Sequence, residues 1–185
     1  MDMRHIFCAY AGKYIQTTFK TFRIMISEKL QNAINVQITA EMWSSNLYLS
    51  MSFYLKVQGF DGMAEWMKKQ SQEELQHAYD LADYVIKRGG TAKVDKIDVV
   101  PQTWESVQDV FDGVYKHECH VSKLIDDLVN VASEEKDKAS QDFLWGYVRE
   151  QVEEEATALN IAEKIRKCKD EGSILFMDDK LGQRK

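Results

Sequence analysis

Four long stretches with helical periodicity constrain this chain more than any other feature of its sequence. Their apolar side chains recur three and four residues apart, the spacing that places them on one face of an α-helix. The stretches cover residues 27–58, 61–88, 103–132 and 136–170. One proline and nine glycines interrupt 185 residues, so few positions force a helix to stop. An all-α fold around a single core is therefore predicted.

The connections between these stretches predict their arrangement. Ser27 is a candidate N-cap for the first helix, and Gly59 marks a short connection to the second. Residues 89–102, which include Pro101, are long enough to cross the length of a bundle. We predict a four-helix bundle with one long crossover between its second and third helices. A short fifth helix within 173–181 must dock on this bundle, because so short a helix is not stable alone.

The first 24 residues differ from the rest of the chain. They are aromatic and show no clear period, and their charged residues are Arg4, Lys13, Lys20, Arg23 and the single acid Asp2. We expect residues 1–24 to be a flexible extension or a start-site artefact. Residues 25–185 then form one domain.

Charge and cysteine content limit the partners. The formal net charge is −6, which argues against a nucleic-acid partner and suits cationic ligands. Cys8, Cys119 and Cys168 make an odd number without CxxC spacing, so a reduced, cytoplasmic setting is expected. No apolar run approaches the ~20 residues of a membrane span. We predict a cytoplasmic protein that binds neither nucleic acid nor membrane.

Polar side chains interrupt every apolar stripe near its middle. In chain order they are Glu41, Glu74, His77, Glu118, Gln151 and Glu154. Glu41 precedes Glu74 by 33 residues and Glu118 precedes Gln151 by 33, and each pair is followed by a ligand-type residue three positions on. The two halves therefore read E…ExxH and E…QxxE, as if one helix pair had been duplicated.

Energy favours a metal at this level of the bundle. One unpaired buried carboxylate costs roughly several kcal/mol, against a net domain stability of about 5–15 kcal/mol. Protonation would relieve part of this cost, but two divalent cations would balance four carboxylates. One His with mostly oxygen donors suits iron(II), and manganese or zinc could compete. Any one of these residues alone would usually be a solvated residue or a hydrogen-bonded core residue; their matching spacing on four helices predicts the metal pair.

The sequence resembles the bacterial non-haem ferritins over residues 25–185. The motifs that carry the resemblance are EMWSSNLYLSMS, QEELQH, YKHE, REQVEEE and LFMDDKLG. The resemblance implies a ferritin-like bundle that assembles into a hollow 24-mer. It also implies that Fe²⁺ is oxidised by dioxygen or hydrogen peroxide at a di-iron centre within each subunit, and that the ferric product is stored as mineral.

The resemblance implies roles for individual residues. The first iron would be held by Glu41, Glu74 and His77, with Glu74 bridging, and the second by Glu118 and Glu154, near Gln151. A third, outlying iron site would use Glu73, Glu150, Glu153 and Glu154. Tyr48, two helical turns after Glu41 on the same face, would supply an electron; the alternative for Tyr48 is a hydrogen-bonded core residue.

Several residues depart from the patterns of relatives. Because Gln151-xx-Glu154 replaces a second ExxH, the second iron lacks a His and should be held more loosely, so that iron passes through as substrate. Leu75 stands where haem-binding relatives carry Met, and no haem is expected. Trp145 lies one position earlier than the family's Trp, so its indole should point about 100° away.

Two further expectations concern helix faces. Gly146 costs its helix about 1 kcal/mol relative to Ala, which indicates close backbone approach or local bending. His117 and His120 flank Glu118 but should face the surface by helical rotation.

Three alternatives remain open at this point. A di-iron peroxidase or oxygenase would keep its metals as cofactor, whereas a structural bundle would need none. A smaller 12-mer with sites between subunits is disfavoured by the ligand set within one chain and by the fifth helix.

Overall fold

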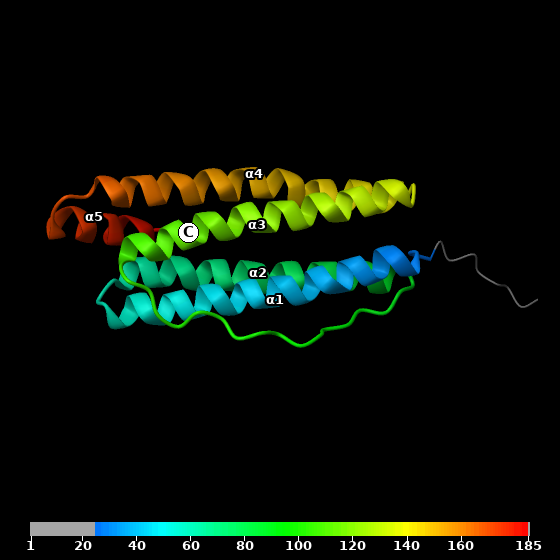
Figure 1. Cartoon of the computed structure of the whole chain (residues 1–185), viewed down its shortest axis with the longest axis horizontal. Helices are drawn as coiled ribbons and strands as arrows, with labels where there is room; N and C mark the ends of the chain where they lie inside the picture. The colour runs from blue at the N-terminus through cyan, green and yellow to red at the C-terminus, as the bar shows by residue number, and fades with distance from the viewer. Residues whose placement is uncertain (1–24, 185) are drawn as a thin grey trace, which may run out of the picture.

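The structure, a computed structural model, describes residues 25–184 as a bundle of helices. The helices are α1 (Glu28–Val57), α2 (Asp61–Lys87), α3 (Val107–Glu134), α4 (Lys138–Lys167) and α5 (Glu171–Gly182). Helices α1 and α2 form one antiparallel pair, α3 and α4 form the other, and α5 lies at one end (Figure 1). The predicted all-α bundle with a short fifth helix is confirmed. The expectation for residues 1–24 lies outside the described residues.

The predicted long crossover is also confirmed. Residues 88–106 run beside α1 along the bundle (Figure 1). Asn35 donates to the Thr91 carbonyl at 3.0 Å, and farther along α1 Ser50 donates to the Pro101 carbonyl at 2.6 Å. Because this segment returns the chain to the end where α2 began, α2 and α3 run in the same direction.

Capping side chains define the helix ends. Ser27 accepts a hydrogen bond from the Leu30 N–H at 3.2 Å, as predicted for an N-cap. The third helix begins at Val107 and not at 103, because Ser106 caps it and Trp104 packs edge-on against Tyr54 of α1 with ring centroids 5.3 Å apart. The predicted start at 103 is therefore wrong by four residues.

The fourth helix is shorter than predicted at both ends. Lys136 adopts a left-handed backbone with φ 55, and Asp137 caps the helix by accepting from the Ser140 N–H. Cys168 is extended, so the helix ends at Lys167 and not at 170. The chain then turns into α5.

Helix α5 supplies a hydrogen-bond acceptor to the first turn of α2. Phe60, the N-cap residue of α2, makes no side-chain cap. Instead Asp178 of α5 accepts a hydrogen bond from the Met63 N–H at 2.7 Å and is itself buried. The helices approach so closely that a Cβ on Gly62 would collide with the carbonyl oxygen of Asp178. Only glycine fits at this contact.

Two apolar clusters fill the bundle on either side of a polar layer. One contains Met51, Met63, Met67, Phe111 and Ile161, and the other contains Ile34, Leu81, Ile125, Leu128 and Leu144. The buried polar residues between them are Glu41, Gln70, Glu74, Glu118 and Gln151. Four of the six residues that interrupt the apolar stripes, namely Glu41, Glu74, Glu118 and Gln151, thus lie in this buried layer.

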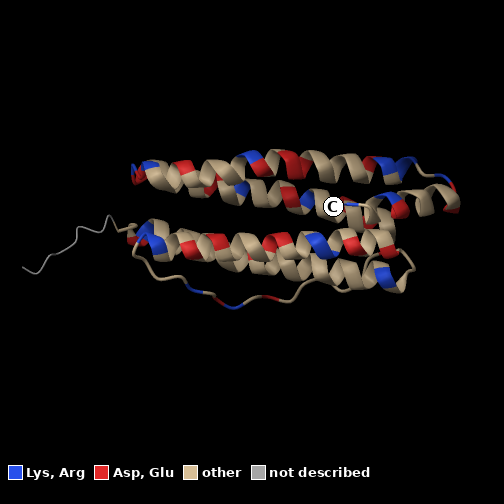
Figure 2. Cartoon of the chain, turned by 180° about the vertical axis from the view of Figure 1, so that it is seen from behind, with Lys and Arg blue, Asp and Glu red and all other residues tan. Residues whose placement is uncertain are grey.

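The outer surface of the described residues is mixed in charge. Acidic and basic residues are interspersed along the ribbons of the long helices (Figure 2). Between residues 25 and 184, no helix has the length and apolar character needed to cross a bilayer.

Candidate metal centre

Glu41 lies in the middle of α1 with one side-chain oxygen unpaired. It is 1% exposed. Gln37, one turn earlier, donates to Glu41 Oε1 at 2.8 Å, whereas Glu41 Oε2 has no hydrogen-bond partner among the described residues. A buried oxygen without a donor is costly, so this position suits a cation.

Two residues of α2 point to the same place. Glu74 and His77 are three residues apart, and His77 Nδ1 lies 3.2 Å from Glu74 Oε2. One ligand atom each from Glu41, Glu74 and His77 falls within 4.8 Å of the others. The opposite ring nitrogen, His77 Nε2, lies 3.3 Å from Glu150 Oε1 on α4, which orients the imidazole. These three side chains can hold a metal ion.

Glu41 and His77 hold protons at neutral pH, and the pKa values of all three groups lie above their ordinary values. Burial raises the pKa of Glu41 to about 8, and the neighbouring Glu74 adds to the effect. Burial likewise raises the pKa of Glu74 to about 6. For His77 burial acts downward, but hydrogen bonds with Glu150 and Glu74 outweigh it and raise the pKa to about 11. A divalent ion would displace these protons and supply the missing positive charge.

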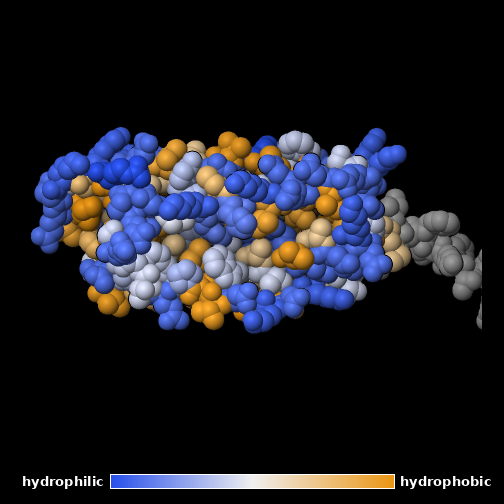
Figure 3. Space-filling view, in the orientation of Figure 1, coloured by the Kyte–Doolittle hydropathy of each residue, from blue (hydrophilic) through white to orange (hydrophobic). Residues whose placement is uncertain are grey.

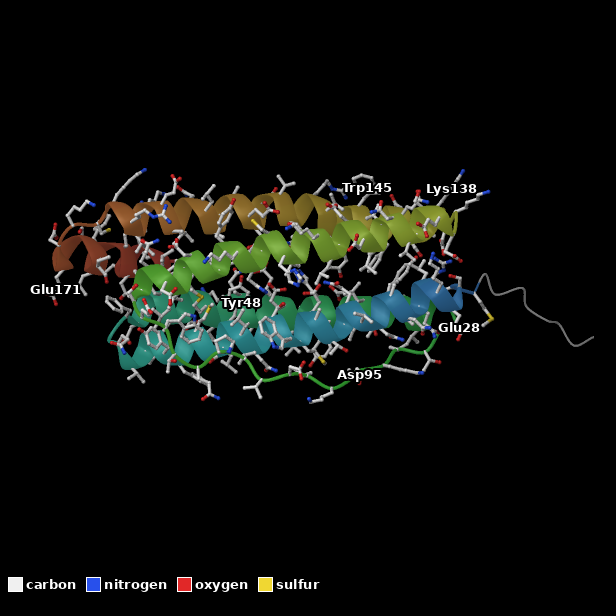
Figure 4. All side chains as sticks on the ribbon, viewed as in Figure 1. Glu28, Tyr48, Asp95, Lys138, Trp145 and Glu171 are labelled. Atoms are coloured by element: carbon white, nitrogen blue, oxygen red, sulfur yellow. The ribbon has the colours of Figure 1, made fainter. Side chains whose placement is uncertain are left out.

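Glu118 of α3 is buried, and both of its carboxylate oxygens have partners. The Tyr48 hydroxyl donates to Oε1, and Gln151 Nε2 donates to Oε2 at 3.1 Å. Burial raises the pKa of Glu118 to about 7. Tyr48 is fully buried between the helix pairs (Figure 4), and burial together with Glu118 raises its pKa well above the ordinary value. The phenol is therefore neutral and hydrogen-bonded to a predicted iron ligand.

Glu154 is only partly buried and lies apart from the converging group. Its Oε2 accepts from Gln70 Nε2 at 3.1 Å. Burial raises the pKa of Glu154, and Glu73 and Glu150 add to the shift. Glu118 and Glu154 are not members of the converging group of Glu41, Glu74 and His77.

Three of the four residues predicted for an outlying site lie around one cleft. Glu73, Glu150 and Glu153 line one cleft of about 950 Å³ beside His77. Glu73 pairs with Arg184 at 2.7 Å, Glu150 with His77, and Glu153 is exposed. Each carboxylate near the cleft thus has a different neighbour.

The surface position predicted for His117 is wrong. His117 Nε2 lies 2.9 Å from Ser44 Oγ, and its ring packs edge-on against Tyr48. Burial lowers the pKa of His117 to about 4, so it stays neutral. The signal was present in the sequence, because His117 falls three residues after Val114 and four before Val121, on the edge of the inward stripe. His120 is exposed as predicted.

The neighbouring aromatic positions give a mixed outcome. Trp145 points outward from α4 (Figure 4) and is 48% exposed, whereas its rotation of about 100° relative to the family's Trp stays a prediction. At Gly146 an added Cβ would meet no atom within 4 Å. Among the described residues the predicted close backbone approach at Gly146 is therefore absent, and the alternative of local bending stays a prediction.

Three residues that support the site were missed by sequence reasoning about ligands. Gln37 and Gln70 orient Glu41 and Glu154, and Arg184 pairs with Glu73. Gln37 and Gln70 lie four residues before Glu41 and Glu74, so the repeat of 33 residues extends to them. Arg184 follows the last helix, where periodicity carries no information.

Comparisons with known proteins identify the relatives of this chain. The profile of the ferritin-like domain matches residues 31–168. The bacterial non-heme ferritin of Bacteroides fragilis strain 638R is 69% identical over 160 residues, covering 86% of this chain and 100% of the relative. The bacterial non-heme ferritin of Escherichia coli O157:H7 is 30% identical, covering 84% of this chain and 94% of the relative. Among solved structures, an open pore ferritin from Archaeoglobus fulgidus superimposes with a TM-score of 0.85 at 46% identity, covering 86% of this chain and 99% of that one.

Proposed function

Since the chain belongs to the ferritin-like domain family, we propose that it stores iron and that each subunit oxidises Fe²⁺ to Fe³⁺ in the polar layer of its bundle. The observation that carries this proposal is the convergence of Glu41, Glu74 and His77, together with a buried Glu41 oxygen that has no hydrogen-bond donor between residues 25 and 184. Iron is treated as substrate, because it must leave the site to be stored.

Each half of the polar layer would bind one Fe²⁺ ion. The first Fe²⁺ binds to Glu41, Glu74 and His77, and the second binds to Glu118 and Glu154 beside Gln151, with Glu74 between them. The carboxylates offset the positive charge that burial makes costly. Dioxygen or hydrogen peroxide accepts the electrons, and the ferric ions leave the ligands.

Tyr48 would supply a further electron to the oxidant. Its hydroxyl donates a hydrogen bond to Glu118, which supports the proposal because a phenol that loses an electron must also lose its proton. The proton passes from Tyr48 Oη to Glu118 Oε1 as the electron leaves. No charge is then created in the buried layer at Tyr48 itself.

Storage requires an enclosed volume, and we propose a shell of 24 subunits. Hydrophobic side chains break up the hydrophilic surface on the face crossed by residues 88–106 (Figure 3). Phe53, Val57 and Val99 are 64%, 84% and 84% exposed and line a cleft between α1 and the crossing segment. An apolar cleft of this kind suits contact with another subunit. The similarity to the open pore ferritin of Archaeoglobus fulgidus supports the same proposal, because a pore implies an enclosed volume.

An aerobic titration tests the function. Purified protein receives increasing Fe²⁺ while ferric absorbance and iron content per chain are measured. We expect rapid oxidation and a load far above the roughly two ions of a two-metal site. A load that stops at two ions would replace storage by the di-iron peroxidase or oxygenase alternative. A variant with Glu74→Ala and His77→Ala serves as the control for iron that oxidises without the site.

A further inference from the structure

Arg184, two residues after α5, makes a dense set of contacts with one face of α2. Its guanidinium contacts Glu73 Oε2 at 2.7 Å and donates to Gln70 Oε1. The same group lies over the Trp66 ring at 5.3 Å, and Lys69 donates to the Arg184 carbonyl. Residues 66, 69, 70 and 73 share a face of α2, so the last described residues follow that helix toward the metal centre.

Gln70 connects Arg184 to the centre. Its Oε1 accepts from Arg184, and its Nε2 donates to Glu154 at 3.1 Å. Because the Gln70 amide accepts one hydrogen bond and donates another, it fixes the orientation of both partners. The position of Glu154, away from the three converging ligands, is therefore tied to the position of Arg184.

The charge of Arg184 falls where another cation could bind. Glu73 lines the same cleft as Glu150 and Glu153, and Glu154 is close enough to feel both Glu73 and Glu150. A guanidinium bound to Glu73 repels a divalent ion that approaches the same carboxylate. It also occupies the oxygen that such an ion would need.

We propose that Arg184 is a tethered cation that competes with divalent metal for Glu73 and, through Gln70, holds Glu154 beside the cleft. Metal binding at the carboxylates of the cleft then requires the C-terminal residues to move off α2. The tail thereby limits how many ions a subunit holds outside the Glu41, Glu74 and His77 group. This inference rests on the proposed function, because it concerns the route of the same metal.

Zinc binding tests the competition without any oxidation. Zn²⁺ alone is titrated into the metal-free full-length assembly by calorimetry, with Arg184→Gln, Arg184→Lys and Lys180→Gln compared to the parent. Arg184→Gln should strengthen the weakest resolved Zn²⁺ site by roughly five- to tenfold, since the competing charge-assisted pair is lost. Arg184→Lys keeps a positive charge but loses the forked contact with Gln70 and Glu73, so its affinity for Zn²⁺ should lie between those of the parent and Arg184→Gln. Lys180→Gln removes a charge from the exposed side of α5 and should change nothing.

A double variant locates the effect. Adding Glu73→Gln to Arg184→Gln should abolish the gain, because the released carboxylate is gone. An unchanged Zn²⁺ isotherm in Arg184→Gln overturns the proposal, as does an equal gain in Lys180→Gln or a gain that survives Glu73→Gln. These outcomes are independent of iron loading, so failure of the storage function would appear separately in the aerobic titration.

Discussion

The α1–α2 and α3–α4 halves of the polar layer share one ligand spacing but differ in how their carboxylates are satisfied. In the first half Glu41 has an oxygen for which the described part of the chain offers no donor, and His77 lies between two carboxylates. In the second half Tyr48 and Gln151 satisfy both oxygens of Glu118. A metal ion gains an unpaired ligand in the first half, but it must displace hydrogen bonds in the second. Equal spacing therefore does not make equal sites.

Removing the unpaired oxygen should have the largest effect. Glu41→Gln keeps the shape of the side chain but removes the charge, so Fe²⁺ oxidation should slow by about 100-fold, the upper range for loss of metal-site support. Stopped-flow absorbance measures the rate. Glu65→Gln, an exposed change on α2, is the control. A loss below about threefold would mean that the first half does not bind iron first.

The same variant should stabilise the metal-free fold. The pKa of Glu41 is about 8 when folded against 4.5 for the ordinary group, so ionisation favours the unfolded state as pH rises between these values. His77 acts in the same direction above its ordinary value of 6.5, because its raised folded pKa favours folding at lower pH. Thermal unfolding with chelator should therefore show a Tm that falls from pH 5 to pH 8, with a smaller fall in Glu41→Gln. A Tm that rises over this range would contradict the assignment.

As the pH is lowered, metal binding to the first half of the layer should weaken before metal binding to the second half. A metal ion must displace protons from Glu41 and His77 in order to bind. Below about pH 8, its affinity should therefore fall by about tenfold per pH unit for each proton that it displaces. The pKa of Glu118 is about 7, so binding to the second half should weaken only below that value. Calorimetry with Zn²⁺ in buffers of different ionisation enthalpy measures the protons released. Equal release at both sites would remove the difference between the halves.

Placing a His at position 151 should make the two halves of the layer more alike in their affinity for iron. Gln151→His recreates ExxH spacing on α4 and should tighten the second site by about tenfold. Iron should then be retained and turnover should fall, which sequential additions of Fe²⁺ would reveal. Val152→His places the same residue on the exposed side of α4 and should leave turnover unchanged. Faster turnover in Gln151→His would show that loose binding is not what releases the iron.

The smallest effect concerns the helix that carries Gln151 and Glu154. Gly146→Ala should stabilise the fold by about 1 kcal/mol, because Ala is the better helix former and its Cβ meets open space. Iron oxidation should not change. Chemical denaturation measures the gain, and a loss of stability would indicate that Gly146 is required at a contact between subunits.

The bundle was predictable because its rules are local. Apolar period, the Ser27 cap and the length of the link between α2 and α3 are each visible in short stretches of sequence. The predicted positions of helix ends were wrong where contacts between residues distant in sequence determine the end. Trp104 has the local pattern of a helix, but its contact with Tyr54 keeps it in the crossing segment.

The convergence of Glu41, Glu74 and His77 was predictable from their spacing, but the separate position of Glu154 was not. Glu41, Glu74 and His77 meet because α1 and α2 are close neighbours, joined by a three-residue turn. Glu154 has equivalent spacing on α4, yet Gln70 and the chain end draw it aside. Contacts such as Arg184 with Glu73 join residues 111 positions apart and follow no period.

The contact between Asp178 and Met63 has a consequence for synthesis of the subunit. The first turn of α2 receives its cap from a residue made 115 positions later, so that turn stays unfinished while most of the chain already exists. Until residue 178 has been synthesised, this N–H group of α2 cannot have its capping partner.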